Sequence, residues 1–261
     1  MPQSPLNVGG SRAKRILITG AATGIGEACA RRLAEQNNIL LLHTGTNEQK
    51  ISAVAEALTG RTNNEVHCFT ADFSKTAAVT QMIQMVRQKV GHIDQLVLNA
   101  GYADKGDFSE LTNEKLRRAL AVMAETPAEL IKAFIGDIQK SSQGRIVSIS
   151  SFVNSSSGAN DVAFTITATA KSALEGLTIE AARQCRNTLA TANIISPGYT
   201  RKNSTKSALS KEQWAALQDS LPTRRLVEPE EVAALVSFLL SEDAAMITGQ
   251  NISIDGGFTL S

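Results

Sequence analysis

The stretch Arg15-Ile-Leu-Ile-Thr-Gly-Ala-Ala-Thr-Gly-Ile-Gly26 decides the fold. It opens with an apolar run of strand length, and apolar residues then recur at helical spacing up to Leu33. Gly20 permits a tight turn, Gly24 lets the main chain approach a diphosphate, and Gly26 lets the helix pack close to the strand. The free N–H groups at the start of that helix would face the anion, so the stretch predicts a phosphate-binding turn. A glycine-rich turn without a ligand is the alternative.

Further short apolar runs follow, separated by longer segments of helical period. Strands are predicted at 15–19, 39–43, 66–70, 94–98, 145–149, 192–196 and 251–254. Helices are predicted from 47 to 58, from an N-cap at Ser74 to Gly91, from 113 to 140 with a bend near Pro127, from 162 to 185 and from 228 to 241. The alternation predicts an α/β fold: a single-domain, Rossmann-type, doubly wound parallel sheet of about seven strands with helices on both faces.

Composition excludes several other classes of function. The chain of 261 residues has 26 Lys and Arg against 25 Asp and Glu, and only 4% aromatic residues, so neither a nucleic-acid partner nor an anionic membrane surface is expected. No apolar run is long enough to span a bilayer. Three cysteines without CxxC spacing are typical of reduced thiols, and we expect a cytoplasmic protein without a metal site. Residues 1–13 are expected to form a flexible leader and 14–261 the folded domain.

Later segments, taken with the glycine turn, resemble the short-chain dehydrogenase/reductase family over residues 14–261. The matching segments are TGxxxGxG at 19–26, Asp72-Phe73, Asn99-Ala100-Gly101, Ser150-Ser151, the helix TATAKSALEGLT around Lys171, Pro197-Gly198, and the runs 225–233 and 254–257. The resemblance implies a nicotinamide dinucleotide held by Gly20, Thr23, Gly24, Ile25, Gly26, Thr44, Asp72, Phe73, Asn99, Ala100, Gly101, Lys171, Pro197 and Gly198. It also implies a small-molecule substrate, a substrate lid at about 200–221, and a homodimer or homotetramer that packs small residues such as Ala168, Ala170, Ala173 and Gly176.

The end of the second predicted strand bears on the choice of dinucleotide. NAD-dependent members of the family tend to carry an acidic residue there, which binds the ribose hydroxyls and repels a 2′-phosphate. This chain has Thr44, Thr46 and Asn47 instead, which can hydrogen-bond a phosphate, although the arginine typical of NADP-dependent members is also missing. We therefore expect NADP(H) in preference to NAD(H). His43 is interpreted as a strand-end residue rather than a phosphate ligand.

The catalytic set of the family is incomplete in this chain. Active members use Asn, Ser, Tyr and Lys, the tyrosine transferring a proton as hydride moves. Ser151 and Lys171 are present, but Thr167 stands at the tyrosine position and Met123 at the position aligned with the asparagine. A threonine hydroxyl is a much weaker acid than a phenol, so the resemblance predicts an altered or impaired proton relay.

Two hypotheses remain open on this basis. The first is an NADP-dependent oxidoreductase that acts on a carbonyl or alcohol, possibly 3-oxoacyl-like, in which Ser151, Lys171 and Thr167 form a remodelled site. Tyr102 or Tyr199 could then supply the missing proton, because each follows a motif at the cofactor end of the sheet; the alternative is that they only line the pocket. The second hypothesis is a catalytically impaired dinucleotide-binding homologue that acts as a partner subunit or sensor.

Overall fold

The computed structural model describes residues 13–60, 65–158, 162–201 and 211–260. Seven parallel strands form one sheet in the order β3-β2-β1-β4-β5-β6-β7. The strands are β1 Arg15–Ile18, β2 Ile39–Thr44, β3 Val66–Thr70, β4 Gln95–Leu98, β5 Arg145–Ile149, β6 Thr191–Pro197 and β7 Asn251–Ile254. The reversal of strand order between β1 and β4 confirms the predicted doubly wound sheet, and it places a crevice at the carboxyl ends of these two strands.

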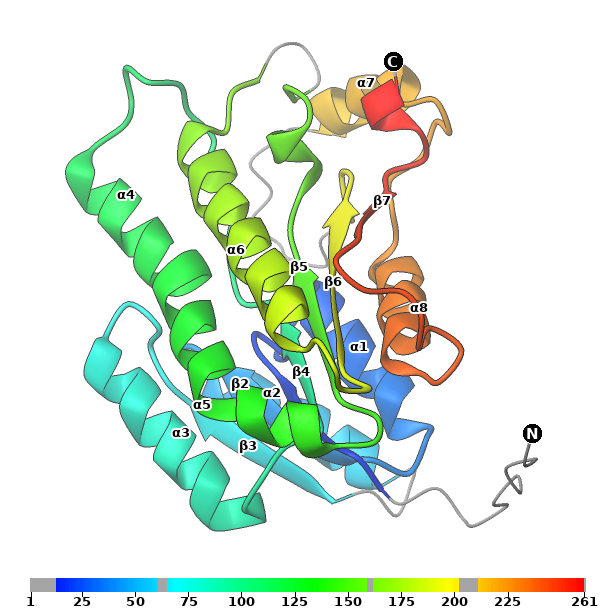
Figure 1. Ribbon diagram of the computed structural model, residues 1–261. Helices are drawn as coiled ribbons and strands as arrows, with labels where there is room; N and C mark the ends of the chain where they lie inside the picture. Colours follow the sequence, from blue (N-terminus) through cyan, green and yellow to red (C-terminus); the bar gives the residue numbers. More distant parts are fainter. Residues whose placement is uncertain (1–12, 61–64, 159–161, 202–210, 261) are drawn as a thin grey trace.

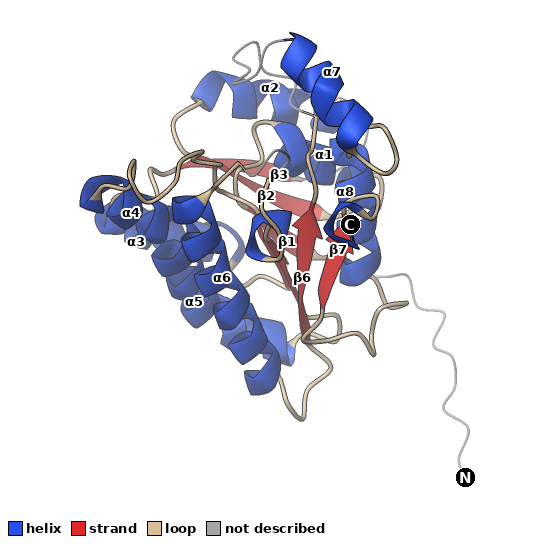
Figure 2. Ribbon diagram, turned by 90° about the horizontal axis from the view of Figure 1, so that it is seen from above, coloured by secondary structure: helices blue, strands red, loops and turns tan. Residues whose placement is uncertain are grey.

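Helices cover both faces of the sheet, as Figure 2 shows from above. The helices are α1 Gly24–Ala34, α2 Glu48–Thr59, α3 Thr76–Val90, α4 Asn113–Leu120, α5 Thr126–Lys140, α6 Thr165–Gln184, α7 Lys211–Ser220 and α8 Pro229–Leu240. One apolar core joins the sheet to α1, α2 and α8. The other joins it to α3, α5 and α6. Central strands buried on both faces need continuous apolar runs such as Ile39–Leu42, and for this reason the sequence revealed them.

The long helix predicted at 113–140 is divided by a π-helical turn, Ala121–Glu125. Regular α-helix resumes at Thr126, with Pro127 in the first turn of α5. Because proline has no N–H to donate to the turn before it, it interrupts the α-helical hydrogen-bond pattern in that preceding turn, where the π-helical residues lie. The irregularity therefore precedes the proline, and it includes Met123. Such turns occur often at functional sites.

Two predicted helix starts were wrong. Ser74 does not cap α3, whose N-cap is Lys75. Asp72 instead accepts hydrogen bonds from the backbone N–H and the hydroxyl of Ser74, which places Ser74 in the preceding turn. Helix α6 begins at Thr165 rather than at 162, because backbone pairing between Gly106 and Phe164 occupies the residues before it.

The carboxyl ends of the strands are covered by short elements from the second half of the chain. Two 3-10 turns, Phe152–Asn154 and Phe258–Leu260, lie there. Figure 1 shows α7 and the C-terminal turn above the end of β6. The predicted leader lies outside the described residues apart from residue 13, and 202–210 of the predicted lid also lie outside them. In the described part of the chain, no helix is long and apolar enough to cross a membrane.

Candidate active site

The glycine turn is built around Gly20, whose φ of +68° lies in the left-handed region. The side-chain amide of Asn99 donates to the carbonyls of Thr19 (2.9 Å) and Gly20 (3.1 Å). The Thr19 hydroxyl accepts from the backbone N–H groups of Asn99 and Ala100, which ties the end of β1 to the end of β4. The turn is therefore fixed from beneath by the Asn99-Ala100-Gly101 segment.

Gly26 has no room for a side chain. A Cβ at this position would stand 2.1 Å from the carbonyl oxygen of Gly20, so α1 packs directly onto the turn. Helix α1 begins at Gly24 with Thr23 as its N-cap, and the Thr23 side chain makes no capping hydrogen bond among the described residues. The N–H groups of the first turn, which include that of Ile25, therefore remain available to an anion.

The residues expected around the adenine and the 2′-phosphate lie at the ends of β2 and β3. Thr44 is buried at the end of β2, while Gly45 and Thr46 are exposed. Asn47 caps α2 by accepting from the Lys50 backbone N–H at 3.1 Å. The carboxylate of Asp72 is held by Ser74, and these hydrogen bonds are the main reason that its pKa lies below the usual value.

Phe73 is buried and does not offer a free aromatic face. Its ring stacks on that of His43, with centroids 3.8 Å apart. No sequence pattern predicts this pair, because the two residues lie on different segments. The structure thus adds His43 to the neighbourhood of the predicted dinucleotide site.

Lys171 is the buried cation of the site. Its Nζ donates to the carbonyl of Ile149 at 2.6 Å, and only 6% of the residue is exposed. Burial lowers the pKa of Lys171 to about 8, although Glu175, one helical turn further on, acts in the opposite direction. The Glu175 carboxylate in turn accepts from the hydroxyl of Ser150 and from the amide of Asn154 (2.8 Å). Sequence reasoning missed Glu175, although its i+4 spacing from Lys171 was a usable signal.

Met123, the residue expected at the asparagine position, lies in the π-helical turn Ala121–Glu125. A Cβ added at Gly101 would stand 3.0 Å from the Met123 sulfur and 3.2 Å from Lys171 Nζ, so the thioether and the ammonium border the same backbone segment. Met123 is fully buried. A thioether cannot carry a proton, so this position contributes no step to a proton relay.

Thr167 is buried, and its hydroxyl is engaged with one neighbour. It accepts from the Asp104 backbone N–H at 2.8 Å and lies 3.4 Å from the Asp104 carbonyl, to which it donates. The hydroxyl therefore anchors the loop after β4 to the start of α6. The residue predicted to replace the family's tyrosine is thus bonded to backbone rather than left free toward a substrate.

Ser151 and the two tyrosines occupy different surroundings. Ser151 is half-buried at the head of the turn Phe152–Asn154. Tyr199 packs in an aromatic group with Phe152 (ring centroids 4.7 Å apart) and Phe258 (5.6 Å). Tyr102 is 38% exposed beside a hollow that Asp104, Lys115 and Arg118 also line. Tyr199 thus belongs to the apolar wall next to Ser151, whereas Tyr102 lies on the outer side of α4.

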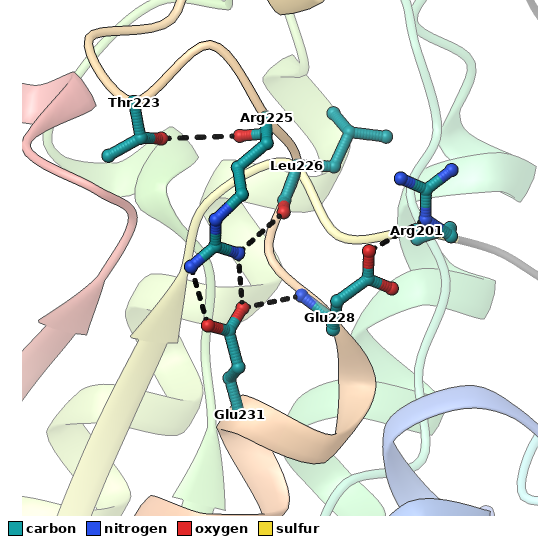
Figure 3. A network of polar contacts seen from close by, with 6 residues as sticks. All are labelled: Arg201, Thr223, Arg225, Leu226, Glu228 and Glu231. Carbon is teal, nitrogen blue, oxygen red and sulfur yellow. Dashed lines mark hydrogen bonds and ion pairs between the residues drawn. The ribbon is translucent and has the colours of Figure 1, made fainter.

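The base of the predicted lid is held by charged residues, shown in Figure 3. Arg225 pairs through two nitrogens with both carboxylate oxygens of Glu231, each at 2.7 Å. Glu231 also accepts from the Glu228 backbone N–H, and Glu228 pairs with Arg201. Together they join Arg201, which lies beyond the end of β6, to the start of α8.

The segment at the end of β6 is packed closely against the chain that follows β7. A Cβ at Gly198 would stand 2.8 Å from Asp255, and the Gly198 N–H donates to the Ile254 carbonyl at 3.0 Å. Pro197-Gly198 is therefore joined to the segment that follows β7. Among the described residues, no three His, Cys, Asp or Glu side chains lie close enough to hold a metal ion.

Comparison with known proteins gives a consistent assignment. A family model described as enoyl-(acyl carrier protein) reductase matches residues 20–259. The 3-oxoacyl-[acyl-carrier-protein] reductase FabG of Escherichia coli (strain K12) is 30% identical over 244 residues, covering 94% of this chain and 96% of the relative. A short-chain dehydrogenase from Burkholderia cenocepacia J2315, solved in complex with NADP, superposes with a TM-score of 0.84 at 27% identity, covering 95% of this chain and 98% of that one.

A third similarity is to the angucycline C-6 ketoreductase LanV, solved with bound NADP. Its TM-score is 0.84 at 27% identity, and the match covers 95% of this chain and 96% of LanV. These matches span nearly the whole described fold, and they include the glycine turn and the Lys171 helix. The chain belongs to the short-chain dehydrogenase/reductase family.

Proposed function

We propose that this protein is an NADP(H)-dependent oxidoreductase that interconverts a carbonyl and an alcohol on a small-molecule substrate of 3-oxoacyl type. The observation that carries the proposal is the fixed glycine turn with Lys171 beside it, since Gly20 and Gly26 leave main-chain N–H groups open at the head of α1. The substrate class is supported by the similarity to FabG, which is a 3-oxoacyl-[acyl-carrier-protein] reductase. The cofactor is supported by the two similar proteins solved with bound NADP.

The residues at the end of β2 fit NADP(H) better than NAD(H). The segment Thr44-Gly45-Thr46-Asn47 contains no carboxylate that would repel a 2′-phosphate. It leads into α2, whose N-terminus favours an anion. NADP(H) bound in this crevice would supply or accept the hydride.

The chain's own residues would orient the substrate and move the proton. In this proposal Ser151 donates a hydrogen bond to the substrate carbonyl, and Lys171 holds the nicotinamide ribose. Thr167 is committed to Asp104 and Met123 carries no proton, so Lys171 takes over the proton transfer. A pKa of about 8 suits that role, because the ammonium is protonated near neutral pH and readily gives up its proton. Water then reprotonates the amine.

A binding assay followed by a turnover assay tests the proposal. NADPH and NADH are titrated by nicotinamide fluorescence, and NADPH oxidation is then measured with ketones that include a 3-oxoacyl thioester. We expect tighter binding of NADPH and turnover that is lost in Lys171→Met and reduced in Ser151→Ala. Tyr199→Phe and Tyr102→Phe serve as controls for the alternative proton donors. Full loss of turnover in either phenylalanine variant would contradict the role given to Lys171.

A second candidate function rests on Thr167 and Met123. A dinucleotide-binding homologue without reductase activity, acting as a partner subunit or sensor, would have no need of the family's tyrosine and asparagine. The double variant Met123→Asn/Thr167→Tyr distinguishes the two functions. If the natural chain binds NADPH without turning over any ketone, and the double variant gains turnover, the second function is supported.

Assembly and location are also proposals. We propose a cytoplasmic location, which is consistent with the three free cysteines. We also propose a homodimer or homotetramer, which is consistent with the open space beside Gly176 on α6. Ala170, however, is fully buried against Ala119 and Met123 of its own chain, so it cannot contribute to a subunit contact. Sedimentation of the wild-type protein and of Gly176→Arg tests this face, since the arginine should reduce the mass of the assembly.

A further inference from the structure

His43 is a buried polar side chain between two parts of the dinucleotide crevice. It lies in β2, and only 1% of the residue is exposed. On one side of its ring lies the glycine turn, and on the other lies the segment 71–73 that follows β3. A polar group this deeply buried costs free energy unless each of its hydrogen-bonding atoms finds a partner.

Both ring nitrogens of His43 have a backbone partner. Nδ1 lies 3.2 Å from the backbone nitrogen of Gly20, and Nε2 lies 2.9 Å from the carbonyl oxygen of Ala71. A backbone N–H can only donate and a carbonyl can only accept, so Nδ1 must be unprotonated and Nε2 must carry the hydrogen. Burial lowers the pKa of His43 to about 4, which keeps the ring in this neutral form.

The contact with Nδ1 completes the fixation of Gly20. The carbonyl of Gly20 is held by Asn99, and its N–H is held by His43. The next N–H, that of Ala21, donates to the His43 carbonyl at 2.8 Å. The orientation of the peptide groups on both sides of Gly20 is therefore set by these neighbours, although glycine itself permits many orientations.

The ring is held in place by a neighbour that is itself fixed. Phe73 stacks on the imidazole with an interplanar angle of 4°. The carbonyl of Phe73 accepts from the hydroxyl of Thr126 at the start of α5. The imidazole thus bridges the phosphate turn and the segment that contains Asp72.

We propose that His43 is a positioning residue for the dinucleotide, which holds the Gly20 peptide group so that the glycine turn is preformed for the diphosphate. The inference rests on the proposed dinucleotide binding, but it does not require turnover. Preformation raises affinity because no ordering free energy is then lost on binding.

Two substitutions test the hydrogen bonds of the two ring nitrogens one at a time. In His43→Asn the amide oxygen can occupy the place of Nδ1 and accept from Gly20, but the side chain is too short to reach Ala71. In His43→Gln the amide nitrogen can occupy the place of Nε2 and donate to Ala71, but no acceptor faces Gly20. Each variant removes one buried hydrogen bond, so the loss of thermal stability should be similar in the two.

Two quantities are measured for each variant: the dissociation constant for NADPH, by fluorescence, and the melting temperature. We expect His43→Asn to bind within about 3-fold of wild type and His43→Gln to bind at least about 10-fold more weakly, the effect of one hydrogen bond. If the enzyme turns over, KM for NADPH should rise in His43→Gln while KM for the ketone is unchanged. His67→Gln, on the neighbouring strand β3, is the matched control and should bind as wild type.

The outcomes against the inference are distinct from those against the proposed function. Equal NADPH dissociation constants in the two variants, or affinity that follows the melting temperature alone, would overturn the role of His43. A wild-type protein that binds neither NADPH nor NADH would overturn the proposed function and this inference with it. Should a variant fail to fold, nitrogen NMR of wild-type His43 tests the proposal instead, because it shows which ring nitrogen carries the proton. A ring protonated at Nδ1 is incompatible with the proposal.

Discussion

The hydroxyl of Thr167 is bonded to the backbone of Asp104, at 2.8 Å from its nitrogen and 3.4 Å from its carbonyl oxygen. Thr167, which the sequence predicts at the family's tyrosine position, therefore joins the loop after β4 to the first turn of α6. Backbone pairing between Gly106 and Phe164 reinforces the same junction. The hydroxyl of Thr167 thus has a structural role at this junction.

Replacing Thr167 by valine tests that contact. Valine has the same shape but no hydroxyl, so the partly buried N–H of Asp104 loses its acceptor. We expect the free energy of unfolding to fall by about 1 kcal/mol. Thr167→Ser keeps the hydroxyl and should lose much less stability. Turnover in the valine variant should stay within about 10-fold of wild type, whereas a loss of 10²-fold or more, the effect of removing a general acid, would return Thr167 to the proton relay.

Replacing Gly26 by alanine tests the glycine turn. The added Cβ would stand 2.1 Å from the Gly20 carbonyl oxygen, so α1 must move away from the turn. We expect NADPH affinity to fall by roughly 10²-fold or more, about 2.7 kcal/mol, and the melting temperature to drop. Gly176→Ala is the matched control in a helix, because no atom lies within 4 Å of its added Cβ. That control should gain up to about 1 kcal/mol; comparable affinities in the two variants would show that the turn does not bind the nucleotide.

The burial of Lys171 predicts a pH dependence of stability. Its pKa is lowered from 10.5 to about 8, so between these two values the unfolded chain holds more protons than the native one. The free energy of unfolding should therefore rise as pH increases from about 8 toward 10.5, by an amount on the order of 3 kcal/mol from this group. Urea unfolding at a series of pH values measures it. Lys171→Met should lack the rise, and an identical slope in the variant would contradict the assignment.

The burial of neutral His43 predicts that the protein loses stability at acid pH. Its pKa is lowered from 6.5 to about 4, so the unfolded chain binds more protons between these values. This contribution to stability is fully present above about pH 6.5 and is lost as the pH falls toward 4, by an amount on the order of 3 kcal/mol. The difference in unfolding free energy between wild type and His43→Asn should shrink over that window. A difference that stays constant from pH 7 to pH 4.5 would speak against a neutral buried ring.

The ion pair between Arg225 and Glu231, at the base of the predicted lid, should contribute little to the free energy of unfolding. Arg225 and Glu231 are about half and more than a third exposed, so solvent screens their attraction despite the two-point geometry. Hydrogen bonds from Arg225 are the main reason that the pKa of Glu231 falls to about 2. We expect Glu231→Gln to lower the free energy of unfolding by about 1 kcal/mol or less, and less still in high salt. A loss of several kcal/mol would show a stronger role in holding α8.

The sequence by itself determined the sheet and the glycine turn. These follow from local signals, because buried parallel strands need apolar runs and a turn beneath α1 needs glycine at set spacing. Helix starts were less certain, as Ser74 and residue 162 show. There the local preference was overridden by Asp72 and by pairing with Gly106, which lies far away in the sequence.

Only the tertiary structure decided what the polar side chains of the site contact. His43, Thr167 and Glu175 are each bonded to a segment between 21 and 63 residues distant, and nothing in the sequence indicates these partners. Such contacts depend on which strand ends and helix starts meet at one edge of the sheet, and periodicity carries no information about that. The assignment of His43 to the glycine turn and of Thr167 to the loop after β4 therefore required the fold.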